Sequence, residues 1–153
     1  MRKVYLAGPI TEDTRTHQWR REVSRALSEK FIIDDPCSSK FDRDLIKEGD
    51  GDSKRFYELV EQHQSEILLP KSYQAVENCD IILVNFAIEP IDRPIIGTVM
   101  EIAWAYALHK VIIAIDGQGY YTKHPMITGA VNAWADTLEE AIEILNEFFT
   151  SKR

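Results

Sequence analysis

Residues 80–86 read DIILVNF, and the next long apolar stretch, residues 97–109, reads GTVMEIAWAYALH. The first stretch is an almost continuous apolar run of strand length, which is typical of the centre of a parallel sheet. The second has helical length, and Glu101 is the only charged side chain between Thr98 and Leu108. Together they predict a strand followed by a helix, which is the repeating unit of an α/β sheet.

The rest of the chain continues this alternation. We expect further strands at residues 3–7, 31–33, 111–115 and 130–135, and helices at residues 17–30, 55–69, 72–78 and 137–149. Pro70 is expected to separate the two middle helices, because proline cannot donate to the helical ladder. Long loops are expected at residues 34–54, 87–96 and 116–126. The pattern predicts one domain, residues 1–153, with a doubly wound five-stranded parallel sheet in the flavodoxin-like order 2-1-3-4-5.

Composition limits the classes of function. The 153 residues suffice for one sizeable core, and 44% hydrophobic with 28% charged residues is ordinary for a globular protein. The net charge of −7 gives no general attraction to nucleic acid polymers or anionic membranes. Cys37 and Cys79 lack zinc or disulfide spacing. With no apolar run long enough for a signal peptide or a membrane span, we expect a cytoplasmic protein that binds small molecules.

Glu101 has two interpretations. Thr98 and Glu101 match the S/T-x-x-E capping box, in which the glutamate accepts from the backbone N–H of the cap residue. Alternatively, the helix opens at the carboxyl end of strand 80–86, and Glu101 faces the crevice where open α/β sheets bind ligands. The local pattern alone favours the cap.

Several other polar groups are expected at the same edge of the sheet. Parallel strands bring the residues that follow them to one crevice. No dinucleotide or P-loop signature and no metal-ligand cluster is visible in the sequence, so we expect neither a cofactor nor a metal. The groups expected there are Tyr5, Gly8, Pro9, Asn85, Asp92, Gly97, Thr98, Glu101, His124 and Met126.

Three segments together resemble a known family. They are KVYLAGPI at residues 3–10, CDIILVNF at residues 79–86 and GTVMEIAWAYAL at residues 97–108. This combination resembles the nucleoside 2-deoxyribosyltransferases and the related deoxynucleoside 5'-monophosphate N-hydrolases. The resemblance extends over most of the chain, and the G-T-x-x-E-I segment after the D-x-x-L-V-N strand is its most specific part.

The resemblance implies a reaction and roles for the residues. Glu101 would attack the anomeric carbon of a 2'-deoxynucleoside, release the base and form a covalent deoxyribosyl-enzyme that a second base attacks, giving net retention. Tyr5 would hydrogen-bond Glu101 and fix its orientation. Asp92 is a weaker catalytic candidate, because the family's acid six residues before the nucleophile is replaced by Ile95 here. Another acid of some transferases is replaced by Ser72.

The resemblance also implies substrate-binding residues and an assembly. Gly8, Pro9, Asn85, Gly97 and Thr98 would bind deoxynucleosides and nucleobases. His124 and Met126 match a segment that reaches a neighbouring subunit's pocket, which implies a homo-oligomer with shared active sites. Trp19 and Trp104, by contrast, are predicted to be core residues.

Other functions remain open at this stage. A hydrolase acting on deoxynucleoside monophosphates would use the same nucleophile with water as acceptor, and Arg15, Arg20 or Arg21 could supply charge near its phosphate. A flavodoxin-like carrier could bind a flavin phosphate through Thr11, Thr14 and Thr16. A nucleotide-sensing protein would keep the fold without turnover. The sequence assigns no residue to base preference or to exclusion of ribose.

Overall fold

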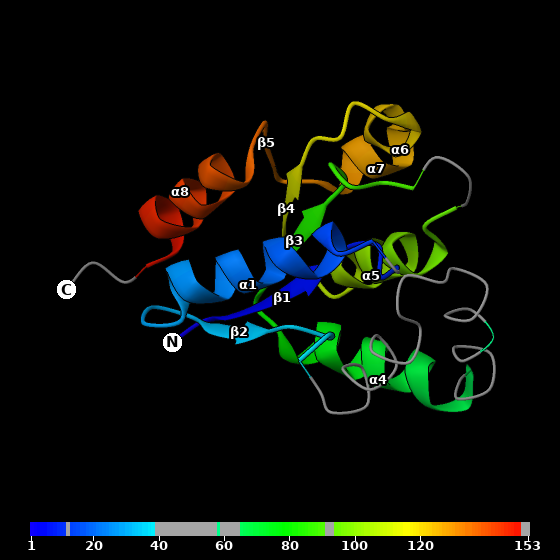
Figure 1. Ribbon diagram of the computed structural model, residues 1–153, viewed down its shortest axis with the longest axis horizontal. Helices are drawn as coiled ribbons and strands as arrows, with labels where there is room; N and C mark the ends of the chain where they lie inside the picture. The colour runs from blue at the N-terminus through cyan, green and yellow to red at the C-terminus, as the bar shows by residue number, and fades with distance from the viewer. Residues whose placement is uncertain (12, 39–57, 59–64, 91–93, 151–153) are drawn as a thin grey trace.

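A computed structural model describes residues 1–11, 13–38, 58, 65–90 and 94–150 (Figure 1). Five parallel strands form one sheet in the order β2-β1-β3-β4-β5. The predicted fold class and strand order are confirmed. The strands are β1 (Lys3–Ala7), β2 (Ile32–Asp34), β3 (Ile81–Asn85), β4 (Val111–Ile115) and β5 (Ala133–Ala135).

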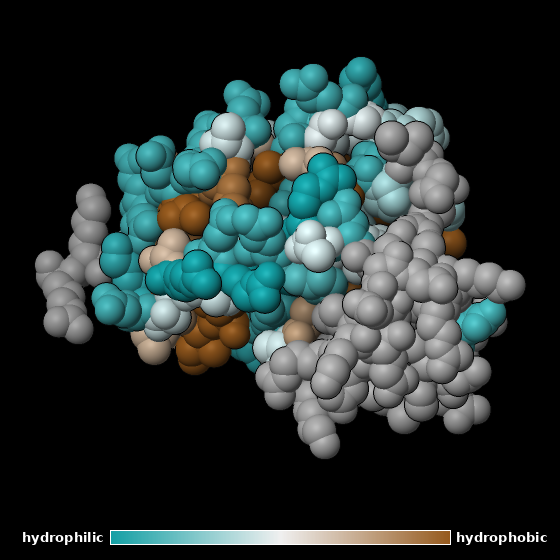
Figure 2. All heavy atoms as spheres, viewed as in Figure 1, coloured by the Kyte–Doolittle hydropathy of each residue, from teal (hydrophilic) through white to brown (hydrophobic). Residues whose placement is uncertain are grey.

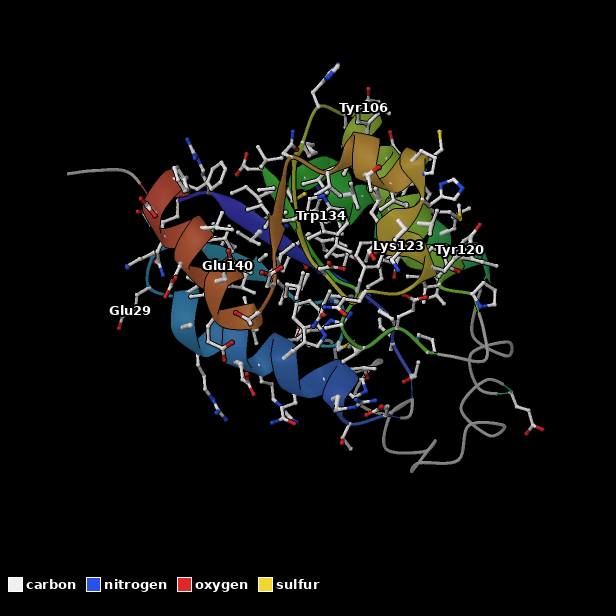
Figure 3. The ribbon with its side chains drawn as sticks, turned by 90° about the horizontal axis from the view of Figure 1, so that it is seen from above. Glu29, Tyr106, Tyr120, Lys123, Trp134 and Glu140 are labelled. Carbon is white, nitrogen blue, oxygen red and sulfur yellow. The ribbon has the colours of Figure 1, made fainter. Side chains whose placement is uncertain are left out.

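Helices cover both faces of the sheet (Figure 1). On one face α1 (Arg15–Leu27) lies beside α8 (Leu138–Phe149), and their apolar side chains share a core with one side of the strands. The opposite face carries α4 (Ser65–Asn78), α5 (Ile96–Ala107), α6 (Tyr120–Lys123) and α7 (Pro125–Ala130). Figure 3 shows this division, with Tyr120 and Lys123 on one side of β5 and Glu140 of α8 on the other.

The period of two along β1 decides which face each side chain joins. Val4 and Leu6 belong to the core under α1 and α8, whereas Tyr5 and Ala7 belong to the core under α5. All four side chains are almost completely buried. Because successive strand residues point to opposite faces, Tyr5 is directed toward the helix that carries Glu101.

Some predicted boundaries are wrong. The helix predicted to stop at Pro70 continues through it, and Ser65–Asn78 is one helix with an exposed proline in its second turn. A single lost backbone hydrogen bond is tolerated there, since α4 packs along α5. Residues 125–130, expected in a loop and the start of a strand, form α7, with Pro125 at its first position. Residues 39–54 of the predicted long loop and most of the predicted helix 55–69 lie outside the described residues.

Hydrophilic side chains cover the outer side of α1, and hydrophobic side chains are visible between α1 and α8 (Figure 2). Among the helices that the structure describes, none has the length and apolar character needed to cross a membrane.

Candidate active site

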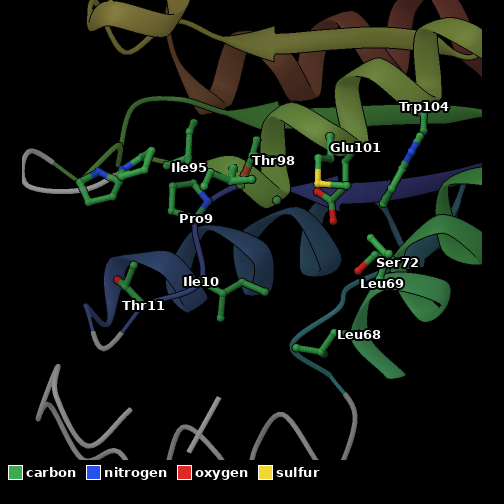
Figure 4. Close-up of a pocket in the computed structure, with 16 residues that line it drawn as sticks. Pro9, Ile10, Thr11, Leu68, Leu69, Ser72, Ile95, Thr98, Glu101 and Trp104 are labelled. Atoms are coloured by element: carbon green, nitrogen blue, oxygen red, sulfur yellow. The ribbon is translucent and has the colours of Figure 1, made fainter. Parts of the chain in front are cut away.

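A cavity of about 540 Å³ lies at the carboxyl end of β1, between the first turns of α5 and the side of α4 (Figure 4). This is the edge at which open parallel sheets bind ligands. Backbone and small side chains form one wall, and apolar side chains form most of the rest. The lining residues are 8–11, 94–98, Leu68, Leu69, Ser72, Pro90, Met100, Glu101 and Trp104.

Glu101 lies on the wall of this cavity and has one hydrogen-bond partner among the described side chains. The Tyr5 hydroxyl donates to Oε1 of Glu101 at 2.7 Å. Tyr5 is 2% exposed, so its ring is fixed by the core under α5. A buried strand residue thus orients a carboxylate on a helix that follows it by almost a hundred residues.

The environment changes the acidity of both groups. Burial raises the pKa of Glu101 to about 7, although the hydrogen bond from Tyr5 and the positive charge of Arg20 each lower it. Burial and the adjacent Glu101 carboxylate raise the pKa of Tyr5 well above its ordinary value. Tyr5 therefore remains a proton donor across the physiological range, and Glu101 changes its charge near neutral pH.

The capping interpretation of Glu101 is wrong. Helix α5 begins at Ile96 with Ile95 at the N-cap position, and no side chain caps it. Thr98 is inside the helix and buried, with 4% exposure, so it cannot supply the cap. The lone carboxylate of this apolar helix is explained by Tyr5 and the cavity.

The structure brings together most of the residues predicted for the site. Gly8, Pro9, Gly97 and Thr98 line the cavity with Glu101. Asn85, by contrast, is outside the lining: it is 4% exposed, and its Oδ1 accepts from the backbone N–H of Ala87 at 2.9 Å, which stabilises the turn after β3. Asp92 lies outside the described residues.

His124 and Met126 do not line this chain's own cavity. His124 is the N-cap residue of α7, and its Nδ1 accepts from the backbone N–H of Met126 at 3.2 Å. Met126 itself is 77% exposed. Both residues are therefore on the outside of the single chain.

Trp104, which was predicted to be a core residue, packs against the core under α5 and also lines the cavity. Its ring is half-buried, lines the cavity and meets Tyr73 of α4 edge-to-face, with ring centroids 5.4 Å apart. The available signal was its spacing, because residues three apart on a helix share a face and Trp104 is three residues after Glu101. Trp19 is a core residue, as predicted.

Arg20 is the second residue whose place was not foreseen. It is completely buried, and its guanidinium donates to the backbone carbonyls of Gly8 and Thr16. Arg15 instead pairs with Asp13 on the surface, and Arg21 is exposed. Helical spacing carried a signal, since Arg20 shares the buried stripe of α1 with Thr16, Val23 and Leu27.

No cluster of three or more His, Cys, Asp or Glu side chains suited to a metal ion occurs in the described parts of the chain. Cys37 and Cys79 are both buried. Burial raises the pKa of the Cys79 thiol to about 11, so it remains protonated.

Comparison with known proteins gives a family and two similar folds. Residues 1–118 match the family described as nucleoside 2-deoxyribosyltransferase like. A 2-deoxyribosyltransferase from Leishmania mexicana is 15% identical with a TM-score of 0.64, covering 97% of this chain and 99% of that one. A CMP N-glycosidase from Clostridium botulinum is 18% identical with a TM-score of 0.51, covering 95% of this chain and 99% of that one. No curated protein matches the sequence significantly.

Proposed function

The chain belongs to the nucleoside 2-deoxyribosyltransferase-like enzyme family, and we propose that it transfers 2-deoxyribose between nucleobases. The observation that carries this proposal is the Tyr5–Glu101 pair on the wall of a cavity large enough for a nucleoside. The two similar structures named above act on the bond between a sugar and a base, which agrees with this chemistry.

The proposed reaction has two displacements at one carbon. A carboxylate oxygen of Glu101 forms a bond to the anomeric carbon as the bond to the base nitrogen breaks, and that electron pair leaves with the base. A nitrogen of a second base then attacks the same carbon and gives its proton to the base form of the acid that protonated the first base, and Glu101 leaves as a carboxylate. Charge on the sugar ring in each transition state is positive, so the adjacent carboxylate stabilises it before it forms the covalent bond.

Tyr5 and Asp92 are given separate roles in this scheme. Tyr5 holds Oε1 of Glu101 by its hydrogen bond, which leaves the other carboxylate oxygen for attack. We propose Asp92 as the weaker candidate for protonating the leaving base, because Ile95 occupies the position of the family's usual acid. Asp92→Asn should then slow transfer from nucleosides whose base is a poor leaving group more than transfer from nucleosides whose base leaves readily. Equal slowing of both would exclude this role.

The residues at the two ends of the cavity suggest an orientation for the substrate. Thr11 and Thr98 provide hydroxyls at one end, among the apolar Pro9, Ile10 and Ile95, and Leu69 and Trp104 form an apolar wall at the other (Figure 4). We place the sugar at the end with the hydroxyls and the base against the Trp104 ring, one helical turn from Glu101. Trp104→Ala should raise KM about tenfold with a smaller change in kcat, while Tyr106→Ala, an exposed aromatic on the same helix, should change neither.

Product analysis by chromatography tests the activity. The protein is incubated with deoxyinosine, with and without adenine, and separately with deoxynucleoside monophosphates. Deoxyadenosine that appears only with adenine establishes the transferase. Silence with every substrate would contradict an enzymatic role and favour a binding protein. Mass spectrometry after acid quenching should detect a deoxyribosyl adduct on the peptide containing Glu101.

A hydrolase is the second candidate, favoured by the similarity in fold to a CMP N-glycosidase. It would use the same Glu101, with water as the second nucleophile. Free base released from a monophosphate without an acceptor would identify it. The arginines considered for its phosphate provide no support, since Arg20 donates to carbonyls beneath the cavity and Arg15 is paired with Asp13.

We further propose a homo-oligomer with shared active sites. The exposed Met126 and the neighbouring His124 would enter a partner's cavity rather than their own. Sedimentation should then give a mass above that of one chain. Mixing the inactive variants Glu101→Gln and Met126→Asp should restore activity, because a mixed assembly contains one site with both residues intact. No restoration would contradict a shared site.

A further inference from the structure

Arg20 is the largest completely buried side chain described in this protein, at 0% exposure. It lies on the stripe of α1 that faces the sheet, among Thr16, Trp19, Val23 and Leu27. A buried cation is costly unless its charge and its N–H groups are matched, so its surroundings need an explanation.

The partners of Arg20 are mainly backbone carbonyls. Nη2 donates to the Gly8 carbonyl at 3.0 Å, and Nη1 donates to the carbonyls of Pro9, at 3.4 Å, and of Thr16. The guanidinium also lies over the Trp19 ring, with 4.8 Å between Cζ and the ring centroid. The Asp35 carboxylate is 3.7 Å from Nε, which makes no hydrogen bond. The charge of Arg20 is therefore matched by backbone carbonyl dipoles, the Trp19 ring and a single salt bridge to Asp35.

Two of these carbonyls belong to the wall of the cavity. Gly8 and Pro9 form the turn that follows β1, and both line the site. The turn is held from other sides as well, because a Cβ at Gly8 would come within 3.3 Å of both the Asn85 carbonyl oxygen and the Trp19 ring. Arg20 thus holds a tightly packed turn in the cavity wall, at the end where we place the sugar.

The same charge acts on the catalytic pair. The positive charge of Arg20 lowers the pKa of Glu101 and of Tyr5, opposing the effect of burial. Tyr5 on β1 and Arg20 on α1 are the titratable or charged groups that influence Glu101 among the described residues. Arg20 lies beneath the turn, and Tyr5 contacts Glu101 directly.

We propose that Arg20 is a positioning residue: its guanidinium holds the Gly8 and Pro9 carbonyls in the cavity wall, and its positive charge acts on Glu101, which lines the same cavity. This inference rests on the proposed function in one respect, since only the anion of Glu101 can attack the sugar. Arg20 would contribute in two ways: its guanidinium fork fixes the Gly8–Pro9 turn, and its charge acts on the Glu101 carboxylate.

Two substitutions separate these contributions. Arg20→Gln removes the charge, and Arg20→Lys retains the charge but loses the planar fork. Arg21→Gln is the matched control, because Arg21 is the exposed neighbour on the same helix. For each variant, the pH dependence of kcat/KM is measured with deoxyinosine and adenine, and the Glu101 carboxyl carbon is titrated directly by NMR.

The expected results differ between the variants. Arg20→Gln should move the Glu101 titration and the rising limb of the pH profile upward by about one pH unit. Arg20→Lys should leave that limb in place and raise KM about fivefold, because one of the two turn carbonyls, Gly8 or Pro9, loses its hydrogen-bond donor. Arg21→Gln should match the wild type in both measurements.

Contrary results are equally specific. A Glu101 titration unchanged by Arg20→Gln, or shifted equally by Arg21→Gln, would overturn the electrostatic role. If Arg20→Gln does not fold, Arg20→Lys decides the positioning role, since an unchanged KM in that variant would overturn it. The NMR titration needs no turnover, so a wild type without transferase activity contradicts the proposed function and still allows this inference to be judged.

Discussion

The pairs Thr98–Glu101 and Thr137–Glu140 have the same spacing, but their side chains have different partners. Thr137 is the N-cap of α8, where its Oγ1 accepts from the backbone N–H of Glu140 at 3.1 Å and Glu140 accepts from the N–H of Asp136 at 2.7 Å. Thr98 is buried inside α5, and Glu101 accepts from a tyrosine on another element. The comparison shows that a capping motif forms a cap only where the helix actually begins.

The two glutamates also differ in what surrounds them. Glu140 lies on α8, on the face of the sheet opposite the cavity (Figure 3). Glu101 is half-buried on the cavity wall, where burial raises its pKa to about 7. An acid held by local backbone stabilises a helix terminus, whereas an acid placed against a cavity by a distant residue is available for chemistry.

The largest difference should appear in activity. Glu101→Gln should lower the rate of base exchange by at least about a thousandfold, because it removes the nucleophile and keeps the side chain's size. Glu140→Gln should keep the rate within about twofold. Chromatographic rate measurements at pH 8 compare the two. Comparable losses in both variants, or retained activity in Glu101→Gln, would refute the distinction.

The free energy of unfolding should rise in Glu101→Gln, although the activity falls. Its pKa is raised from an ordinary 4.5 to about 7 in the folded protein, so ionisation lowers the free energy of unfolding as pH rises through this window. Glu101→Gln should therefore be more stable than the wild type by roughly 3 kcal/mol at pH 8, with little difference at pH 4.5. Urea unfolding at both pH values measures this. A stabilisation independent of pH would contradict it.

Removing the Tyr5 hydroxyl, the hydrogen-bond partner of Glu101, should lower the rate of base exchange less than removing Glu101 itself. Tyr5→Phe deletes the hydrogen bond that lowers the pKa of Glu101, so the rising limb of kcat/KM, expected near pH 7 in the wild type, should move to higher pH. The rate at pH 7 should fall about tenfold and partly recover at pH 9. Tyr106→Phe, on the exposed side of α5, is the control. A uniform loss at every pH would mean that Tyr5 acts on orientation alone.

These residues also show how far sequence reasoning extends. The strands were predictable because their apolar runs are short and separated by turn residues, and their alternation with helices is typical of a doubly wound parallel sheet, of which the order 2-1-3-4-5 is one of two common forms. Glu101 was identifiable because a charge in an apolar helix needs a partner. Its hydrogen bond to Tyr5 followed only from the family resemblance, since the two residues are far apart in the sequence.

Two parts of the site were beyond that reasoning for different reasons. Trp104 looked like a core residue because helical spacing does not distinguish a packed ring from one that faces a cavity. The sequence offered Arg20 only as one of three arginines that could supply charge near a phosphate, because its burial depends on the Gly8 and Pro9 carbonyls, which only the folded turn brings to it. Non-local packing, rather than local propensity, decides both positions.

The smallest effect belongs to the cap itself. Thr137→Ala should lower the free energy of unfolding by about 1 kcal/mol, because the N–H of Glu140 loses its acceptor at the helix terminus. Thr137→Ser keeps an oxygen at this position and should match the wild type in urea unfolding. Neither variant should alter base exchange, since Thr137 contributes nothing to the cavity wall. A loss of activity in Thr137→Ala at full stability would mean that this T-x-x-E pair also reaches the site, and the contrast with Thr98 and Glu101 would no longer hold.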